Sequence, residues 1–355
     1  MKLPKAKNLN SEKYVAGLSL FKQKFAKIKL SANESALGPS PKAVKEYIKV
    51  SKNFKRYPDS EGTFLRETIA RKFKLDQSRI IIGNGSDQVL ELICKAFLNK
   101  NDEVIVSKYS FIIYRIYSKL NSAKIIYAPE NNFTSSVINI LSRVTRKTKI
   151  IFIANPNNPT GTYLTHYEID KFLQKVSSDI IIVLDLAYYE YVTTDDYINT
   201  LEILNNYKNV LITKSFSKIH GLSALRVGYG MGDKKLIEIM NRVRQPFNVN
   251  SIAQKAAIAS LDDANYLQKS IEYNTKEREF LYKCLKEMSI NYIPSQGNFI
   301  CIDVNQSGRK IFELLLKKGV IVRPIELYEM PNFIRVTIGQ RSENEFFIQK
   351  LKECL

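Results

Sequence analysis

A lysine, two serines and an arginine lie close together in segment 215–226, which reads Ser-Phe-Ser-Lys-Ile-His-Gly-Leu-Ser-Ala-Leu-Arg. Lys218 has the hydroxyls of Ser215 and Ser217 beside it, and Arg226 follows eight positions later. A lysine amine can form a Schiff base with an aldehyde, while hydroxyls and a guanidinium can bind phosphate oxygens. The segment therefore predicts a site for a phosphorylated aldehyde. The alternative is a serine-rich loop that carries a solvated lysine.

A glycine-containing turn, Gly-Asn-Gly-Ser-Asp at residues 83–87, follows an apolar run and precedes a helical pattern. Glycines let the backbone approach a ligand, and the free amides of a helix N-terminus attract phosphate. The turn thus indicates further phosphate ligands. It can also be an ordinary capped turn, with Ser86 or Asp87 as the N-cap.

A second turn, Asn-Pro-Asn-Asn-Pro-Thr-Gly at residues 155–161, follows another apolar run. Two prolines fix φ and Gly161 permits a positive φ, so an asparagine amide can be aimed at a ligand. Seven consecutive turn-forming residues with three asparagines favour a functional role, although a purely structural turn is possible.

Asp185 ends an apolar strand, and Tyr188 lies three residues further on. A carboxylate in such a place is costly unless a cation or an N–H group meets it. A protonated pyridine nitrogen is such a partner, and Tyr188 could bond the neighbouring ring oxygen. The alternative is a helix cap followed by a core tyrosine.

One arginine, Arg335, interrupts the apolar stretch 333–338. A buried arginine generally binds an anion, so Arg335 is a candidate substrate ligand, with a structural salt bridge as the alternative. Arg323 presents the same ambiguity with weaker support.

Short runs rich in Ile and Val alternate with helical patterns over about 150 residues, which favours a doubly wound α/β sheet, mostly parallel. We expect helices at 88–98 and 168–176. Ligands bind such sheets beyond the carboxyl ends of the strands, where Gly83, Asn155, Asp185 and Ser215 lie. The expected strands are 80–82, 103–106, 149–154, 180–184 and 209–212.

The pattern changes beyond about residue 250. A long helical stretch (251–288) leads to strand patterns at 298–304, 320–323 and 333–338, with a helix at 310–318 among them. We therefore predict an N-terminal arm (1–30), a large α/β domain (31–245) and a smaller α+β domain (246–355).

The formal charge of +19 could indicate a nucleic-acid-binding protein. The basic residues are scattered along the whole chain and form no basic tail or helix, which argues against that class. A basic surface would also attract an anionic substrate.

Cysteine and histidine usage makes a metal site improbable. The four cysteines are far apart, and the only histidines are His166, expected at the surface, and His220, expected in packing beside the Lys218 segment. No apolar run reaches the roughly 20 residues that span a bilayer, and the basic N-terminus lacks the apolar stretch of a secretory signal. We expect a cytoplasmic protein with reduced thiols.

Taken together, these segments resemble the fold-type I pyridoxal-phosphate aminotransferases, and within them the histidinol-phosphate aminotransferase family. Ser35, Gln88 and Tyr109 depart from that family's usual residues, but none removes a group that the chemistry requires. The matching segments, in the order and spacing typical of the family, are 30–40 (Leu-Ser-Ala-Asn-Glu-Ser-Ala-Leu-Gly-Pro-Ser), 56–59 (Arg-Tyr-Pro-Asp), 83–87, 155–161, 215–226, 244–250 and 294–299.

The resemblance implies roles for individual residues. Lys218 would form the Schiff base with pyridoxal 5′-phosphate, Asp185 would pair with the ring nitrogen, Tyr188 and Asn158 would bond the ring oxygen, and Phe111 would stack on the ring. Tyr57 would reach the phosphate from a partner subunit, which implies a homodimer with shared sites. The remaining roles are phosphate binding by Gly85, Ser86, Ser215, Ser217 and Arg226, and substrate binding by Arg335, Arg323, Asn33 and Tyr14.

The implied reaction is transamination of L-histidinol phosphate with 2-oxoglutarate, which gives imidazole acetol phosphate and glutamate, a step of histidine biosynthesis. Lys218, once released from the aldehyde, could itself shuttle the proton. Two enzymatic alternatives share the fold and cofactor: a phosphoamino-acid decarboxylase and a broader aromatic aminotransferase. A basic nucleic-acid-binding protein is the non-enzymatic alternative.

Overall fold

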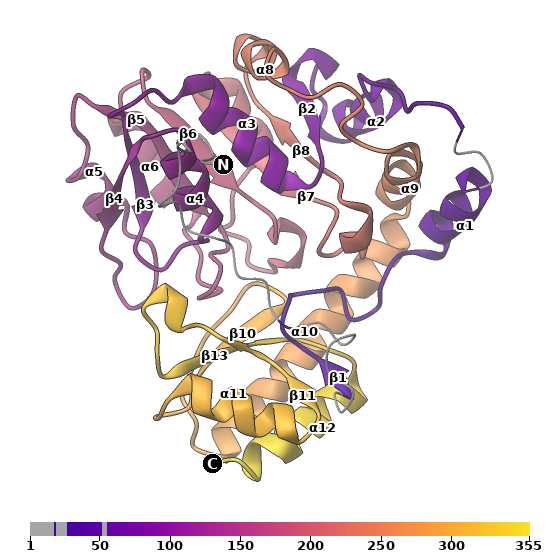
Figure 1. Ribbon diagram of the computed structural model, residues 1–355, viewed down its shortest axis with the longest axis vertical. Helices are drawn as coiled ribbons and strands as arrows, with labels where there is room; N and C mark the ends of the chain where they lie inside the picture. The colour runs from indigo at the N-terminus through magenta and orange to yellow at the C-terminus, as the bar shows by residue number, and fades with distance from the viewer. Residues whose placement is uncertain (1–17, 19–26, 52–54) are drawn as a thin grey trace, which may run out of the picture.

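The computed structural model describes residue 18 and residues 27–51 and 55–355. Figure 1 shows two parts, a larger one built around a central sheet and a smaller one below it that contains the C-terminus. The long helix α10 (Ala264–Glu287) runs from the larger part into the smaller one.

The larger part is organised around a seven-stranded sheet of order β2-β8-β7-β6-β5-β3-β4. Neighbouring strands from β7 to β4 are parallel, whereas β8 pairs antiparallel with both β2 and β7. Six strands therefore point the same way, and the predicted mostly parallel sheet is confirmed. The strands are β2 (Ile80–Gly83), β3 (Glu103–Ser107), β4 (Lys124–Ala128), β5 (Thr148–Ala154), β6 (Ile181–Asp185), β7 (Val210–Ser215) and β8 (Gly228–Met231).

Helices cover both faces of this sheet, because successive strand residues point to opposite sides and most of them are apolar. In β6, for example, Ile182 and Leu184 enter the core beneath α2, α5, α6, α7 and α9, while Val183 faces α3, α4 and α8. The helices are α1 (Pro41–Val50), α2 (Thr63–Phe73), α3 (Ser86–Phe97), α4 (Ile113–Leu120), α5 (Val137–Leu141), α6 (His166–Lys175), α7 (Thr200–Asn206), α8 (Lys234–Asn241) and α9 (Ser251–Leu261).

Two strands of this sheet lack the apolar signature on which the prediction rested. The edge strand β4 exposes Lys124 and Tyr127, and β8 contains two glycines in Gly-Tyr-Gly-Met. At Gly230 a Cβ atom would come within 3.1 Å of the side chains of Val89 and Ile81, so small residues are required where α3 crosses the sheet.

The smaller part combines a four-stranded antiparallel sheet of order β12-β13-β10-β9 with a two-stranded parallel pair, β1 and β11. Their apolar side chains pack with α10, α11 and α12 into a separate core. The elements are β1 (Ile28–Lys29), β9 (Tyr292–Ile293), β10 (Phe299–Asp303), α11 (Gly308–Lys317), β11 (Val320–Ile321), β12 (Arg323–Pro324), β13 (Phe333–Thr337) and α12 (Arg341–Lys352).

Two predictions for this part of the chain were wrong in detail. The helical stretch 251–288 is interrupted, because Asp262 ends α9 and Asp263 begins α10, and aspartate favours such termini. The strand 320–323 is two short strands in different sheets, because β11 pairs with β1 and β12 pairs with β13. The domain boundary at residue 245 stays a prediction. Among the described residues no helix is long and apolar enough to cross a membrane.

Candidate active site

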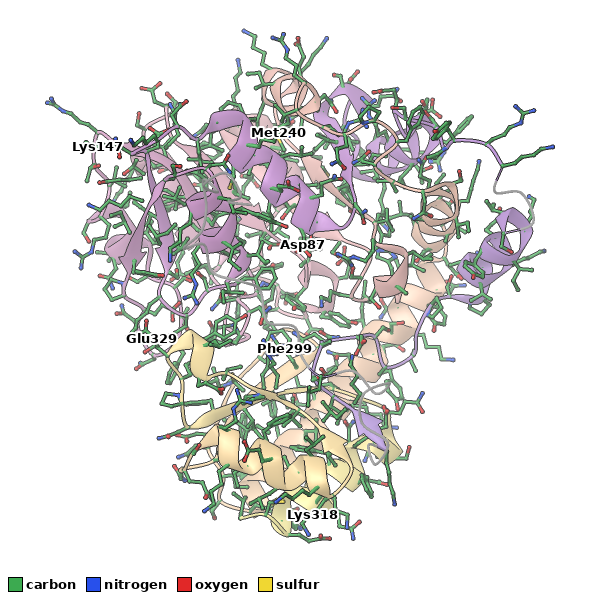
Figure 2. The ribbon with its side chains drawn as sticks, in the orientation of Figure 1. Asp87, Lys147, Met240, Phe299, Lys318 and Glu329 are labelled. Atoms are coloured by element: carbon green, nitrogen blue, oxygen red, sulfur yellow. The ribbon has the colours of Figure 1, made fainter. Side chains whose placement is uncertain are left out.

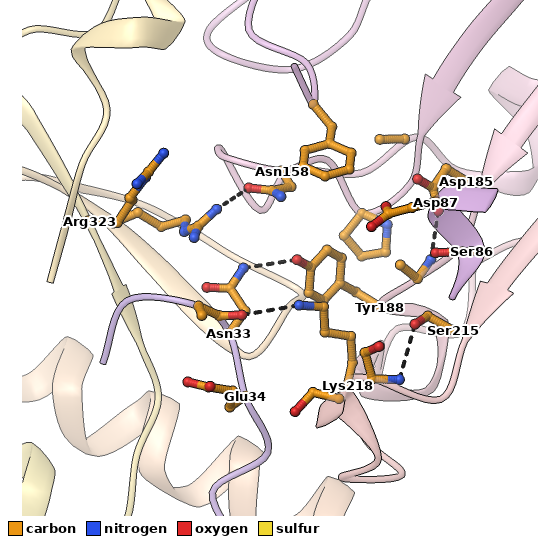
Figure 3. A pocket seen from close by; sticks show the side chains of 18 of the residues that line it. Asn33, Glu34, Ser86, Asp87, Asn158, Asp185, Tyr188, Ser215, Lys218 and Arg323 are labelled. Atoms are coloured by element: carbon orange, nitrogen blue, oxygen red, sulfur yellow. Dashed lines mark hydrogen bonds between the residues drawn. The ribbon is translucent and has the colours of Figure 1, made fainter. Parts of the chain in front are cut away.

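A cavity of about 240 Å³ lies where the carboxyl ends of the large sheet meet the smaller part (Figure 3). Gly85 directly precedes one of its lining residues, Tyr57 does not line it, and Tyr14 lies outside the described residues. The predicted site residues that do line it are Asn33, Ser86, Phe111, Asn158, Asp185, Tyr188, Ser215, Ser217, Lys218, Arg226, Arg323 and Arg335.

Lys218 follows the end of β7 and is partly buried in the cavity wall. Its amine donates a hydrogen bond of 3.2 Å to the carbonyl of Ala32 and lies 5.5 Å from the centre of the Tyr188 ring. Burial, assisted by the positive charge of Arg335, lowers the pKa of the Lys218 amine to about 8. About a tenth of the amine is therefore neutral at pH 7, far more than for an ordinary lysine, and the neutral form is the nucleophile.

Asp185 ends β6 with its carboxylate buried. Its Oδ2 accepts a 2.7 Å hydrogen bond from the Tyr114 hydroxyl, and its Oδ1 accepts from Thr213 at 3.1 Å and from the Ala187 N–H at 3.3 Å. The last bond is a local turn interaction and not a helix cap, because the short 3-10 helix that follows (Tyr189–Tyr191) has Tyr188 as its N-cap. The carboxylate also lines the cavity. Burial raises the pKa of Asp185 to about 6, so above that pH the site offers a buried anion to a cationic group.

Tyr188 follows β6 and lines the cavity. Its hydroxyl accepts a 2.9 Å hydrogen bond from the Asn33 amide, which leaves the hydroxyl hydrogen available to a ligand. Asn33 itself has a φ of 55° and is anchored through its N–H to Thr337 on β13. Asn33 thus connects Tyr188 to the small sheet.

Arg335 lies on β13 and is only 7% exposed. It donates to Asn158 Oδ1 and, at 2.9 Å, to the carbonyl of Ser31, while its Nε has no hydrogen-bond partner among the described residues. Neither of these acceptors is a carboxylate, so among the described residues Arg335 forms no structural salt bridge. Because arginine only donates, Asn158 turns its oxygen to Arg335 and keeps its NH₂ group to donate elsewhere.

The second arginine stands directly opposite the first. Arg323 on β12 is the cross-strand partner of Arg335, and both line the cavity. Like charges at facing positions destabilise a sheet. An anion bound in the cavity would lie close to both guanidinium groups.

A phosphate-sized cradle lies at the opposite end of the cavity. Arg226, with a φ of 54°, donates to Ser217 Oγ at 3.1 Å and to Asp87 Oδ2 at 3.3 Å, and Ser215 Oγ accepts from the Ser217 N–H. Figure 2 shows Asp87 at the end of α3 that faces the smaller part. Hydroxyls, a guanidinium and the N-terminus of a helix are the donors that phosphate prefers.

Residue 85 adjoins the phosphate-binding residues, and a side chain larger than that of glycine would collide with Arg226. It is the N-cap of α3 with a φ of 76°, so the expectation of Ser86 or Asp87 as N-cap was wrong. A Cβ atom at residue 85 would overlap Nη2 of Arg226. The glycine therefore lets the arginine lie against the helix terminus.

The remaining predicted residues lie away from the cavity. The Tyr57 side chain is 82% exposed and stacks on Phe247. His220 is buried, packs against the Phe216 ring and shares a 2.7 Å hydrogen bond with Ser260 Oγ, as a packing role requires. His166 begins α6 and is partly buried.

Several cavity-lining residues were not predicted as site residues, and the ionisable ones among them are Glu34, Asp87, Tyr114 and Tyr328. Glu34 and Asp87 adjoin predicted residues, so the segments around Asn33 and Ser86 could have indicated them. Tyr114 lies three residues after Phe111, at helical spacing. Tyr328 had no sequence signal, because only the fold brings it to the cavity.

Known proteins match almost the whole chain. The family described as aminotransferase class I and II matches residues 26–351. The chain belongs to this family. A histidinol-phosphate aminotransferase of Pelagibacter ubique is 43% identical over 356 aligned residues, covering 99% of each chain.

Solved structures of the family share the fold. A histidinol-phosphate aminotransferase from Sinorhizobium meliloti, solved in complex with pyridoxal-5′-phosphate, superimposes with a TM-score of 0.89 at 24% identity, covering 93% of this chain and 91% of that one. An L-threonine-O-3-phosphate decarboxylase from Porphyromonas gingivalis superimposes with a TM-score of 0.81 at 20% identity, covering 92% and 98%. At these identities the likeness establishes the fold alone.

Proposed function

We propose that this aminotransferase uses pyridoxal 5′-phosphate to transfer the amino group of L-histidinol phosphate to 2-oxoglutarate, giving imidazole acetol phosphate and glutamate in histidine biosynthesis. The observation that carries the cofactor assignment is that one cavity holds the Lys218 amine, the buried Asp185 carboxylate and the Arg226 cradle. The substrate assignment is supported by the full-length relative named histidinol-phosphate aminotransferase.

The residues around the cavity fit this cofactor. When bound, pyridoxal phosphate supplies an aldehyde that takes up amines and a protonated ring that accepts the electrons of a broken Cα bond. Ser86, Ser215, Ser217, Arg226 and the backbone at Gly85 would hold the phosphate. Asp185 would hold the ring nitrogen, Tyr188 and Asn158 would donate to the ring oxygen, and Phe111 would stack on the ring.

Lys218 would act as both covalent anchor and proton carrier. With a pKa of about 8, its amine can accept a proton and give it back near neutral pH. The carbonyl of Ala32 accepts a hydrogen bond from this amine and orients it. Asp185, once ionised, would keep the ring nitrogen protonated throughout, as a buried carboxylate paired with a cation does.

One site must accept two different anions in turn. The phosphate ester of histidinol phosphate and the α-carboxylate of glutamate would meet Arg335, whose planar fork suits either group. Arg323, which faces Arg335, would add a second positive charge. Asn33 lines the same cavity and would also contact the substrate.

A homodimer in the cytoplasm completes the proposal. Tyr57 is exposed and does not line the cavity of its own chain. This is the position expected of a residue that contributes to the site of a partner subunit. α1 and α2 expose four large apolar side chains that a second copy could cover. They are Val44, Tyr47, Ile48 and Phe64, which are 39% to 61% exposed.

The test is a half-reaction. The protein is loaded with pyridoxal phosphate and mixed with L-histidinol phosphate, without a keto acid, while the absorbance of the cofactor's aldehyde form is followed. We expect this absorbance to fall and to return when 2-oxoglutarate is added. Lys218→Ala should abolish turnover, and borohydride reduction should attach the cofactor to Lys218 in the parent protein only.

Other outcomes distinguish the alternatives. Release of carbon dioxide from L-threonine O-3-phosphate, without a keto product, would indicate a phosphoamino-acid decarboxylase, whose fold this chain shares. Equal rates with L-phenylalanine or L-tyrosine would indicate a broader aromatic aminotransferase. Failure to bind pyridoxal phosphate, with turnover by Lys218→Ala, would refute the proposal.

A further inference from the structure

Tyr114 contacts the Asp185 carboxylate from a different element of the fold. It belongs to α4, is only 1% exposed and donates its hydroxyl hydrogen to Asp185 Oδ2 at 2.7 Å. Burial raises the pKa of the Tyr114 hydroxyl well above its ordinary value, and the charge of Asp185 raises it further. The phenol therefore stays protonated and remains a donor near neutral pH.

The Tyr114 ring is fixed on two sides by aromatic neighbours. It stacks on Phe152 of β5, with centroids 4.8 Å apart and planes 4° from parallel. Phe111 meets it edge to face, at 5.8 Å and 88°. Such contacts hold a ring in one orientation. The hydroxyl hydrogen bond therefore has little freedom to lengthen.

The two oxygens of Asp185 are held differently. Oδ1 has two donors, the Thr213 hydroxyl and the Ala187 N–H, whereas Oδ2 has Tyr114 as its one donor among the described residues. The bond to Tyr114 is also shorter than the bonds to Oδ1. Loss of the Tyr114 hydroxyl would leave Oδ2 without a hydrogen-bond donor among the described residues, and only the donors to Oδ1 would then hold the carboxylate.

We propose that Tyr114 is a positioning residue that holds both the Asp185 carboxylate and the Phe111 ring in place for the cofactor. This inference rests on the proposed function, because it acts through the group that Asp185 and Phe111 would hold. Tyr114 does not itself need to touch the cofactor. One side chain would align the partner of the ring nitrogen and the residue that stacks on the ring face.

The surroundings of Asp185 set the direction of the effect. Hydrogen bonds from Tyr114 and Thr213 favour the ionised carboxylate, whereas burial and the charge of Asp87 on α3 favour the protonated one. Tyr188 and Tyr197 also interact electrostatically with Asp185 and are neutral near pH 7, because burial raises the pKa of both hydroxyls. Removal of the Tyr114 hydroxyl therefore shifts Asp185 toward protonation, and the pairing with a cation is lost at a higher pH.

The experiment compares Tyr114→Phe with the parent protein and with Tyr117→Phe, a control on the same helix. Each protein is loaded with pyridoxal phosphate, and the dissociation constant of the cofactor is measured by fluorescence from pH 5 to 8. In Tyr114→Phe we expect affinity about tenfold weaker near pH 7 and an acid midpoint about one pH unit higher. Tyr117→Phe should match the parent.

Two further variants separate the two roles. Thr213→Val removes one donor from Asp185 Oδ1 and leaves the other, the Ala187 N–H. The acid midpoint of cofactor binding should therefore rise as in Tyr114→Phe, but by less. Phe111→Leu keeps the Tyr114 hydroxyl and should weaken binding without moving the acid midpoint. These variants decide the matter if Tyr114→Phe fails to fold, as judged by thermal unfolding without cofactor.

Cofactor binding by the parent protein separates a failure of the positioning role from a failure of the proposed function. If the parent protein binds pyridoxal phosphate at Lys218 but Tyr114→Phe behaves like Tyr117→Phe, Tyr114 is structural and the positioning role is wrong. If Phe111→Leu moves the acid midpoint as far as Tyr114→Phe, the hydroxyl is not the cause. If the parent protein binds no cofactor, the proposed function fails first.

Discussion

Lys218 and Asp185 face the same cavity, and burial moves both toward their neutral forms. The amine has its pKa lowered to about 8 and the carboxyl has its pKa raised to about 6. For the carboxyl, the native state binds protons more tightly than the unfolded chain. Asp185 therefore costs stability as pH rises from about 4 to about 6, and a bound cation would offset that cost. The site is thus prepared for a ligand that is cationic near Asp185.

The pKa of Lys218 leads to the first prediction. The rate at which pyridoxal attaches to the cofactor-free protein should rise with pH and level off above a midpoint near 8, because only the neutral amine attacks. Stopped-flow absorbance measures this rate, with Lys218→Ala as the blank. Pyridoxal is used because it carries no phosphate that titrates in this range.

Arg335 provides the control for this pH profile. Its positive charge contributes to the lowered pKa of Lys218, second only to burial. Arg335→Gln should therefore move the midpoint to higher pH, whereas Arg335→Lys keeps the charge and should move it less. A parent midpoint near the ordinary lysine value of about 10.4 would contradict the burial argument.

At the scale of elements, the parallel strands bring distant segments to one edge. β2, β5, β6 and β7 run in the same direction, so the residues at their carboxyl ends converge. The edge strand β4 and the antiparallel β8 contribute no predicted site residue. The elements that position the site were therefore those with the clearest apolar patterns.

The glycine that precedes α3 gives the second prediction. Gly85→Ala would place a Cβ atom against Arg226 and force a non-glycine residue to a φ of 76°. We expect the affinity for pyridoxal phosphate to fall about tenfold or more, since the arginine must move away from the phosphate. Isothermal titration calorimetry on the cofactor-free protein measures this loss.

A second glycine separates steric overlap from backbone strain. Gly38 has a φ of 69°, but a Cβ atom there would meet nothing within 4 Å. Gly38→Ala should therefore lower the thermal stability through strain alone and leave cofactor affinity unchanged. If both variants lose affinity equally, the overlap with Arg226 is not the cause.

The sequence predicted the mostly parallel sheet and many of the cavity-lining residues, because several reactive side chains directly follow or end the apolar strands. Lys218, Asp185 and Arg335 each interrupt or end an apolar run, which is a local signal. The interactions that tune them are not local: Tyr114 reaches Asp185 from another element, and Asn33 meets Tyr188 across the chain. Sequence spacing could not predict these contacts, because they depend on how helices and sheets pack.

At the scale of the whole molecule, the cavity depends on contacts between the two parts. An ion pair of 3.2 Å joins Lys108, after β3, to Glu329, and the Phe133 ring meets Phe333 at 5.4 Å. Figure 2 shows Glu329 at the edge of the smaller part that lies nearest the larger one. These contacts hold β13, and with it Arg335, in place against the large sheet.

The proposed homodimer gives the last prediction. Tyr57→Ala and Lys218→Ala should each have little activity, but co-expression with two different tags yields mixed dimers. If Tyr57 serves the partner's site, each mixed dimer has one site with both Tyr57 and Lys218 intact. The unseparated mixture should then have about a quarter of the parent activity, and the purified mixed dimer about half. Tandem affinity purification isolates the mixed species for a turnover assay.

The same measurement tests the alternative that Tyr57 serves the cavity of its own chain. If Tyr57 served its own cavity, every site in a mixed dimer would lack either Tyr57 or Lys218, and the mixture would show no gain over the separate variants. A matched pair, Lys218→Ala with Arg226→Ala, provides the control, since both residues line one cavity in a single chain. Because each chain supplies both residues to its own cavity, every site of that mixed dimer lacks either Lys218 or Arg226. No activity should therefore return, and only the pair with Tyr57 should complement.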